Sequence, residues 1–382
     1  MTQGASQVGL IELYQHSEVV EAFIHMLPQS VVVHLYAAPQ VVSALSKEGI
    51  ERCSAIREVL QDKRRADVID NARGALNQLD CLIVTTLGLD QGLSSALQSL
   101  YVPRYLVVHD ASFHFSRRPL LSLRLLDLFR NLKYRIAGSW SERFQKNRGW
   151  SGFFAPSNEV KQYIVSCGVG YQLVLPVNLG INYACNRSEL QRLRKDRSSK
   201  ADREYLKVGI PGSVDTNIRD YRPIIYTMQH SSRHTRWVLP GVLRSVGASD
   251  AIEQMKYAAG QNTTQQVVLR QSNMDYAHAL ADTEVFVLCL RSTAVYASQV
   301  ERLGITKVPG AEDDQSRHRK FAFVSAEFNG RSTFRPYQQN YSGGEELLKL
   351  IETFRYEDAP QPPRIDLEAV RQDVGTFIGF PK

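Results

Sequence analysis

Residues 208–221, VGIPGSVDTNIRDY, combine residue types that bind phosphate in α/β proteins. The apolar, β-branched run 205–210 predicts a strand, Pro211 and Gly212 predict a turn, and residues 221–229 predict a helix. A helix that begins after such a turn offers free backbone N–H groups and the positive end of its dipole to an anion. The stretch therefore predicts a phosphate site.

Arg219 is the side chain of this stretch best suited to a diphosphate. We expect an exposed loop arginine whose guanidinium clamps a diphosphate held at Gly212 and Ser213. The alternative is a plain Pro-Gly turn, because the Gly-rich fingerprints of phosphate loops are missing. The position of the stretch, directly after a charged linker where a second α/β domain should begin, favours the phosphate site.

His109 and Asp110 form a second candidate pair, at the end of the apolar run 104–108. Ligands bind at the carboxyl ends of strands in open α/β sheets. A His-Asp pair there could orient an acceptor hydroxyl or act as a base near neutral pH. The alternative is an aspartate that caps the loop beside a structural histidine.

His16 and Glu18 lie at the first strand-to-helix turn. We interpret Glu18 as a carboxylate that complements the dipole at the start of a helix. For His16 a catalytic role and a structural role remain open.

Two other charged stretches have less specific interpretations. The acidic run 312–314 follows Pro309 and Gly310 and is expected to be a solvated loop, not a metal site. Residues 116–135 form a basic, leucine-rich helical pattern. This helix is expected either to be buried in the core or to make weak contact with an anionic membrane through Arg117, Arg118 and Arg124.

The composition is that of a globular protein with an anionic partner. The 382 residues suggest two domains, 43% of them are hydrophobic, and the net charge is +7 with a pI of about 9.1. The five cysteines contain no C-x-x-C pair, which argues against a disulfide framework or a zinc site. No signal peptide and no apolar run of membrane-spanning length is recognisable, so we expect a cytoplasmic protein.

Alternation of apolar and helical patterns predicts the α/β class, with parallel sheets in two Rossmann-like domains. The expected strands are 7–13, 30–37, 81–86, 104–109, 152–156, 171–176, 205–210, 235–239, 265–269, 284–290 and 320–325. The expected helices are 18–26, 39–47, 50–61, 67–78, 119–134, 158–166, 220–230, 249–259, 273–281, 296–303, 344–354 and 366–377. Residues 186–204 are rich in charge and poor in apolar residues, which indicates an exposed linker.

Four segments resemble the GT-B glycosyltransferases, in particular the group 1, family 4-like members. FFAPSNEVKQYIV (153–165) and LVLPVNLGIN (173–182) resemble the end of their first domain and the crossing to the second. IPGSVDTNIRDY (210–221) resembles the first strand, turn and helix of their second domain. GLIELYQHSEVVEAFIHML (9–27) resembles the opening of bacterial members.

The resemblance implies two Rossmann-like domains that face a cleft. It places an acceptor domain at 1–185, a charged linker at 186–204, and a nucleotide-sugar domain at 205–342. A C-terminal helical tail, 343–382, is expected to pack back on the first domain.

The implied activity is transfer of a sugar from a nucleotide-sugar donor to a glycan, lipid or other acceptor, without a cofactor, metal ion or nucleic acid. The expected catalytic residues are His16, His109 and Asp110, with His109 or Asp110 in contact with the acceptor. The donor is expected to contact Gly212, Ser213, Arg219 and Tyr296. The region 284–296 lacks the E-x7-E pair of the retaining members, which leaves the stereochemical outcome open. The alternatives are a catalytically inactive binding or scaffold protein on the same fold and, less favoured, a nucleotide-sugar epimerase.

Overall fold

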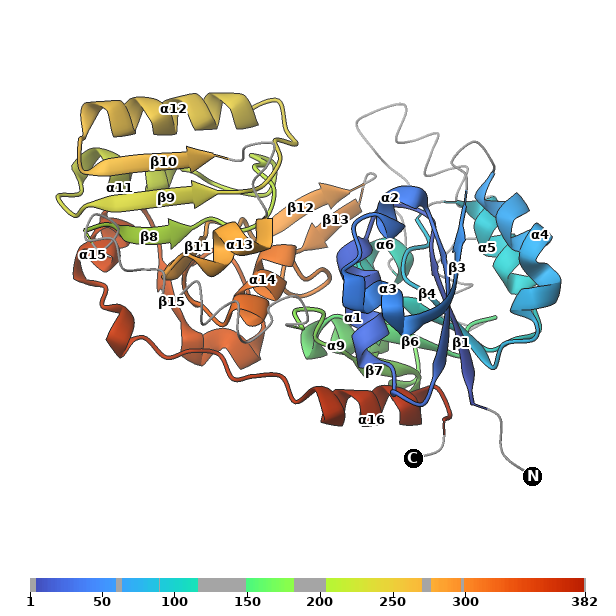
Figure 1. Ribbon diagram of the computed structural model, residues 1–382. Helices are drawn as coiled ribbons and strands as arrows, with labels where there is room; N and C mark the ends of the chain where they lie inside the picture. Colours follow the sequence, from blue (N-terminus) through green and yellow to red (C-terminus); the bar gives the residue numbers. More distant parts are fainter. Residues whose placement is uncertain are drawn as a thin grey trace. The chain divides into compact units, whose positions relative to one another are not determined.

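The computed structural model describes residues 5–59, 64–88, 90–115, 149–181, 204–269, 276–296 and 299–380. These residues divide into two compact units (Figure 1). Unit 1 comprises Met1–Leu179, Ala297–Gln299 and Ile365–Lys382, and unit 2 comprises Gly180–Tyr296 and Val300–Arg364. The linker expected at 186–204 lies outside the described residues, except for Glu204.

Unit 1 is built on a seven-stranded parallel sheet with the order β3-β2-β1-β4-β5-β6-β7. Its strands are β1 (Gln7–Glu12), β2 (Val32–Ala37), β3 (Cys53–Glu58), β4 (Cys81–Val84), β5 (Arg104–Val107), β6 (Gly152–Ala155) and β7 (Val174–Pro176). The central strands β4, β5 and β6 are buried along their whole length, as continuous apolar runs in a parallel sheet require. The carboxyl ends of these strands meet at one edge of the sheet.

The described helices of unit 1 are α1 (Ser17–Met26), α2 (Pro39–Val42), α3 (Lys47–Arg52), α4 (Arg65–Leu76), α5 (Gln91–Gln98), α6 (Ala111–Phe115), α9 (Asn158–Ser166) and α16 (Leu367–Phe377). Although α16 follows unit 2 in the sequence, it packs in unit 1: the Phe377 ring lies 5.5 Å from that of Tyr105 and 5.2 Å from that of Phe154. Arg371 also donates from Nε to the carbonyl of His25 at 3.0 Å.

Unit 2 contains a six-stranded parallel sheet with the order β10-β9-β8-β11-β14-β15 and a separate pair, β12-β13. The strands are β8 (Leu206–Gly209), β9 (Thr235–Leu239), β10 (Gln265–Leu269), β11 (Val285–Leu288), β12 (Thr293–Tyr296), β13 (Gln299–Arg302), β14 (Phe321–Ser325) and β15 (Gln338–Tyr341). The described helices are α11 (Arg222–His230), α12 (Ala248–Gln261), α13 (Tyr276–Ala281), α14 (Gly310–His318) and α15 (Gly344–Thr353). Two parallel sheets flanked by helices confirm the predicted fold class.

Two expected helices are wrong. The pattern 50–61 predicts a helix, but α3 ends at Arg52 and the chain continues as the edge strand β3, paired with β2 through a register shift. This strand is half-exposed and carries charges, so its sequence shows no buried alternation. The pattern 296–303 also predicts a helix, but β13 pairs there with β12, and the left-handed backbone of Gly304 (φ 82°) follows it.

The interpretation of the run 312–314 as a solvated loop is also wrong. These residues belong to α14, where Glu312 is fully buried and Asp314 is 4% exposed. Arg331 explains this burial, because its Nη2 lies 2.9 Å from Asp313 and its backbone N–H donates to Glu312 at 2.8 Å. Such a distant partner cannot be recognised from local composition.

Candidate functional site

Glu12 joins two loops at the carboxyl edge of the unit 1 sheet. Its side chain is fully buried at the end of β1 and accepts hydrogen bonds from Thr85 Oγ1 at 2.7 Å and from Thr86 Oγ1 at 2.6 Å. It also accepts from the backbone N–H of Tyr14 at 2.7 Å. The carboxylate therefore fixes the loop after β1 against the loop after β4, the neighbouring strand.

His16 and His109 come together at the same edge. The two rings stack with centroids 4.9 Å apart and planes 19° apart. His109, which follows β5, contacts the carbonyl of Thr85 through Nε2 at 2.8 Å. A carbonyl can only accept, so we assign the ring proton of neutral His109 to Nε2 and its basic lone pair to Nδ1. The structure thus brings together two histidines that the sequence placed on separate loops.

Glu18 adds a negative charge to this pair. Its Oε1 lies 3.4 Å from Nδ1 of His16, and 54% of its side chain is exposed. Partial desolvation acts to raise the pKa of Glu18, but the hydrogen bond and the charge of His16, with a contribution from His109, outweigh it, so the pKa is lowered. Glu18 lies in the first turn of α1 as expected.

Asp110 follows His109 and precedes α6. Its backbone carbonyl accepts from the N–H of His114 at 3.3 Å, and its side chain is half-buried. This is the geometry of a residue that starts a short helix. It keeps Asp110 beside His109 along the chain.

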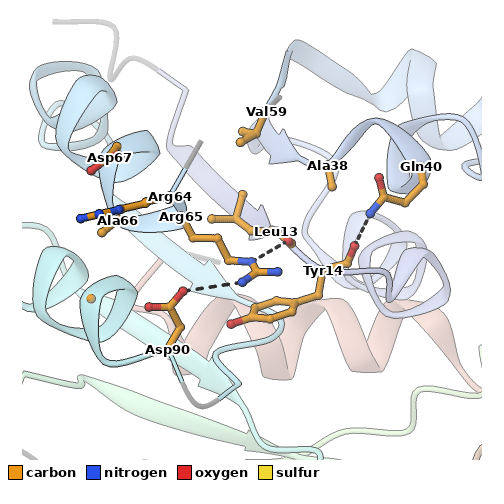
Figure 2. A pocket seen from close by; sticks show the side chains of 11 residues that line it. Leu13, Tyr14, Ala38, Gln40, Val59, Arg64, Arg65, Ala66, Asp67 and Asp90 are labelled. Atoms are coloured by element: carbon orange, nitrogen blue, oxygen red, sulfur yellow. Dashed lines mark hydrogen bonds and ion pairs between the residues drawn. The ribbon is translucent and has the colours of Figure 1, made fainter. Parts of the chain in front are cut away.

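A cavity of about 620 Å³ opens at the same edge, where the loops after β1, β2 and β3 meet the first turns of α4 and α5 (Figure 2). We call it the Tyr14 cavity; Tyr14, Gln40, Val59, Arg65 and Asp90 are among the residues that line it. Gln40 donates from Nε2 to the carbonyl of Tyr14 at 2.7 Å, and Tyr14 donates its hydroxyl to the carbonyl of Leu87 at 2.9 Å. The cavity and the histidine pair therefore share the loop that follows β1.

The candidate phosphate loop of unit 2 differs from the expectation in three ways. First, the N–H of Gly212, whose φ is 86°, already donates to the hydroxyl of Tyr276 at 2.5 Å. Second, α11 begins only at Arg222, and the Asp220 carboxylate accepts from the backbone N–H of that residue at 3.1 Å. An acidic side chain therefore occupies the helix terminus that was expected to hold phosphate.

Third, Arg219 is not an exposed loop arginine, and that prediction is wrong. It is 3% exposed and donates from Nε to the carbonyl of Ser213 at 2.9 Å. A Cβ at Gly212 would lie 2.2 Å from Nη2 of Arg219, so the guanidinium fills the space beside this glycine. Nη1 is buried and has no hydrogen-bond partner among the described residues. The sequence could not show this burial, because a loop arginine normally faces solvent.

Tyr276 and Asp314 complete the support of this loop. The Tyr276 hydroxyl donates to Oδ2 of Asp314 at 2.6 Å, and Nη1 of Arg317 donates to Oδ1 at 2.9 Å. Burial raises the pKa of Asp314 to about 6, against the opposing effects of Arg317 and Tyr276. Sequence analysis missed both residues as parts of the site, since nothing local links them to Gly212.

Three predictions concern residues or side chains that lie outside the part of the chain that the structure describes. They concern the side chain of Tyr296, the helix expected at 119–134, and the membrane contact through Arg117, Arg118 and Arg124. Within the described ranges, no group of three or more His, Cys, Asp or Glu side chains is arranged to hold a metal ion. In the same ranges, no helix has the length and hydropathy needed to cross a membrane.

Comparison with solved structures establishes the fold. A structure of Anabaena Alr3699/HepE in complex with UDP and glucose superposes with a TM-score of 0.61 at 13% identity, over 97% of this chain and 98% of that one. A glycosyltransferase from Rickettsia africae superposes with a TM-score of 0.57 at 10% identity, over 98% and 95% of the two chains. The chain has the GT-B fold.

The fold is shared with enzymes of a second kind. The UDP-GlcNAc 2-epimerase from Neisseria meningitidis, bound to UDP-GlcNAc, superposes with a TM-score of 0.54 at 10% identity, over 97% of this chain and 99% of that one. No protein-family model and no curated protein matches the sequence. Identities this low show the fold alone.

Proposed function

We propose that this GT-B protein is a glycosyltransferase that uses a UDP-sugar donor. The observation that carries the proposal is the stacked pair His16–His109 at the carboxyl edge of the unit 1 sheet, where α/β proteins bind their ligands. UDP is the nucleotide in the Anabaena structure of the same fold. A titratable pair at a ligand-binding edge supports acid–base chemistry on an acceptor hydroxyl.

In this proposal unit 1 activates the acceptor. An imidazole of the pair takes the proton of the acceptor hydroxyl, the acceptor oxygen bonds to the anomeric carbon, and the bond from that carbon to the diphosphate breaks. Glu18 stabilises the imidazolium that results, because its carboxylate lies 3.4 Å from Nδ1 of His16. Asp110 is assigned to acceptor binding beside His109.

Unit 2 binds the donor, and Gly212 and Ser213 contact its diphosphate. Arg219 supports donor binding from the buried side of this loop. It donates a hydrogen bond to a carbonyl and not to a carboxylate, and one of its buried N–H groups has no described partner. Its positive charge favours an anion at the loop. We also assign Tyr296 to the donor.

Neutralisation of the leaving diphosphate by Arg219 and backbone groups makes the proposed transfer independent of metal ions. We further propose a glycan or lipid-linked acceptor and a cytoplasmic location with weak contact to anionic membranes. Transfer that is abolished by a chelator and restored by Mg²⁺ would contradict metal independence.

The test is donor turnover by the purified full-length chain. UDP-glucose, UDP-galactose and UDP-GlcNAc are offered with a glycan library, and UDP release and glycosylated products are measured by mass spectrometry. Sugar transfer by wild type that is lost in His109→Gln supports the proposal. UDP binding without turnover of any donor supports the inactive binding protein instead.

A nucleotide-sugar 2-epimerase is the second candidate, favoured by the superposition on the Neisseria enzyme. Incubation with UDP-GlcNAc alone separates the two activities. Appearance of the 2-epimer in the proton NMR spectrum, without an acceptor, would favour the epimerase.

A further inference from the structure

The Tyr14 cavity has a size and position that the proposed chemistry alone does not explain. Its volume of about 620 Å³ lies within the range of small-molecule sites. Figure 2 shows the Arg65 side chain extending between Leu13, Tyr14 and Asp90 in the middle of the lining. The Arg65 guanidinium therefore lies at the centre of the cavity lining.

Three contacts fix the Arg65 guanidinium. Its Cζ lies 4.0 Å from the centre of the Tyr14 ring, and its Nε donates to the carbonyl of Leu13 at 3.2 Å. Its Nη1 lies 3.7 Å from Oδ2 of Asp90, whose other oxygen caps α5 by accepting from Leu93 N–H at 2.9 Å. The positive charge of Arg65 is thus already countered by a carboxylate that is itself held in place.

The formal charges of the described residues that line the cavity cancel. It contains two arginines, Arg64 and Arg65, and two aspartates, Asp67 and Asp90. Burial raises the pKa of Tyr14 to about 12, so this residue contributes a neutral hydroxyl. The charged side chains of this lining therefore provide no net compensation for the charge of a phosphate or carboxylate.

The polar groups of this lining suit hydroxyl groups. A guanidinium, carboxylates and the Gln40 amide are planar groups that can hydrogen-bond two neighbouring hydroxyls at once. Leu13 and Val59 offer apolar surface to the C–H faces of a ring.

From these features we infer that the Tyr14 cavity binds an uncharged sugar ring and excludes phosphate- or carboxylate-bearing groups. This inference rests on the proposed function in one respect: the bound ring would be the terminal sugar of the acceptor. The cavity shares the loop after β1 with His16, so a ring bound there lies at the sheet edge that carries the proposed base. Arg65 and Asp90 then determine acceptor specificity.

Direct binding to the full chain tests the inference without requiring catalysis. The probes are methyl α-glucoside, methyl α-galactoside and the acidic methyl glucuronide, measured by saturation-transfer NMR. We expect signals from at least one neutral glycoside and at least fivefold weaker binding of the glucuronide. Ala66→Phe, which places a large ring in the lining, should abolish binding, whereas Ala72→Phe on the same helix but outside the lining should not.

A charge change sharpens the test. Asp90→Asn keeps a capping side chain but removes the carboxylate beside Arg65, so it should shift the preference toward the glucuronide by about fivefold, a modest effect because both groups are partly exposed to solvent. Asp70→Asn, on α4 and outside the lining, should leave the preference unchanged.

Preferential glucuronide binding by wild type, equal binding in Ala66→Phe, or no binding of any neutral glycoside would overturn the inference. UDP binding, measured on the same samples, is the separate test of the donor site. If the chain binds glycosides in a manner that depends on Ala66 but does not bind UDP, the sugar site is retained and the transferase is contradicted. If it binds UDP but no glycoside, the donor site is retained and the sugar site is contradicted.

Discussion

The rings of His16 and His109 stack at 4.9 Å although the two residues follow different strands, β1 and β5. Two like charges at this distance repel, so protonation of one ring disfavours protonation of the other. Glu18 lowers this cost on the side of His16. The contact thus places two titratable rings and a carboxylate where the proposed function needs a base.

His109→Gln tests this role with little disturbance of the fold. The glutamine amide can still donate to the carbonyl of Thr85 but cannot act as a base near neutral pH. We expect kcat for sugar transfer to fall about 10²- to 10⁴-fold, with an unchanged Kd for UDP. His34→Gln, a half-buried histidine of β2, is the control and should keep full activity. An unaltered kcat in His109→Gln would remove His109 from the chemistry.

The packing of α16 predicts that the end of the chain stabilises unit 1. The Phe377 ring contacts Tyr105 and Phe154, and a Cβ at Gly152 would lie 2.7 Å from it. Phe377→Ala should lower the free energy of unfolding by about 3 kcal/mol, because it leaves a cavity against the sheet. Thr376→Ala, at an exposed neighbour, should change it by under about 0.5 kcal/mol. Equal urea midpoints for both variants would show that α16 is not needed.

Asp314 predicts a pH dependence of stability. Burial raises its pKa from the ordinary 3.8 to about 6, so between about pH 4 and 6 the folded chain holds a proton that the unfolded chain has lost. The contribution of Asp314 to stability therefore falls as pH rises through this window, by on the order of 2–3 kcal/mol.

Asp314→Asn should remove this part of the pH profile in urea unfolding. The stability of wild type relative to the variant should then be lower at pH 7 than at pH 4. Asp358→Asn, an exposed substitution, serves as the control. Parallel profiles for wild type and Asp314→Asn would show that the carboxyl group titrates normally.

The fold could be predicted from sequence, because apolar periodicity reports burial directly: β9, β10 and α9 have the expected bounds. The errors lie where tertiary partners override local pattern. The pattern of the edge strand β3 predicts a helix because no residue of this strand is fully buried, so the alternation typical of a strand is absent. The acidic start of α14 predicts a solvated loop because its partner Arg331 is distant in sequence.

The candidate site also contains residues that local sequence predicts and residues that only tertiary contacts reveal. His16 and His109 could be identified as candidates because each follows an apolar strand, but their contact depends on the strand order β1-β4-β5. Glu12, Tyr276 and Asp314 could not be identified, since their importance comes from hydrogen bonds to residues of other loops.

The burial of Arg219 changes what its substitution should do. Arg219→Ala removes the donor to the Ser213 carbonyl and empties the space beside Gly212, so we expect a loss of roughly 2–4 kcal/mol in unfolding free energy. UDP affinity should fall about tenfold or more, because the phosphate loop loses both its support and a nearby positive charge. Arg219→Lys should recover part of the affinity but little of the stability, since a lysine cannot reproduce the fixed geometry of the guanidinium.

Arg222→Ala is the matched control for these variants. Arg222 is 80% exposed and pairs with Asp220, so its loss should leave the stability close to that of wild type. Urea unfolding and UDP calorimetry on all four proteins separate the two roles of Arg219. Wild-type stability in Arg219→Ala would contradict its burial. A destabilised variant that binds UDP as tightly as wild type would make Arg219 a structural residue only and leave the donor phosphates to other groups of the chain.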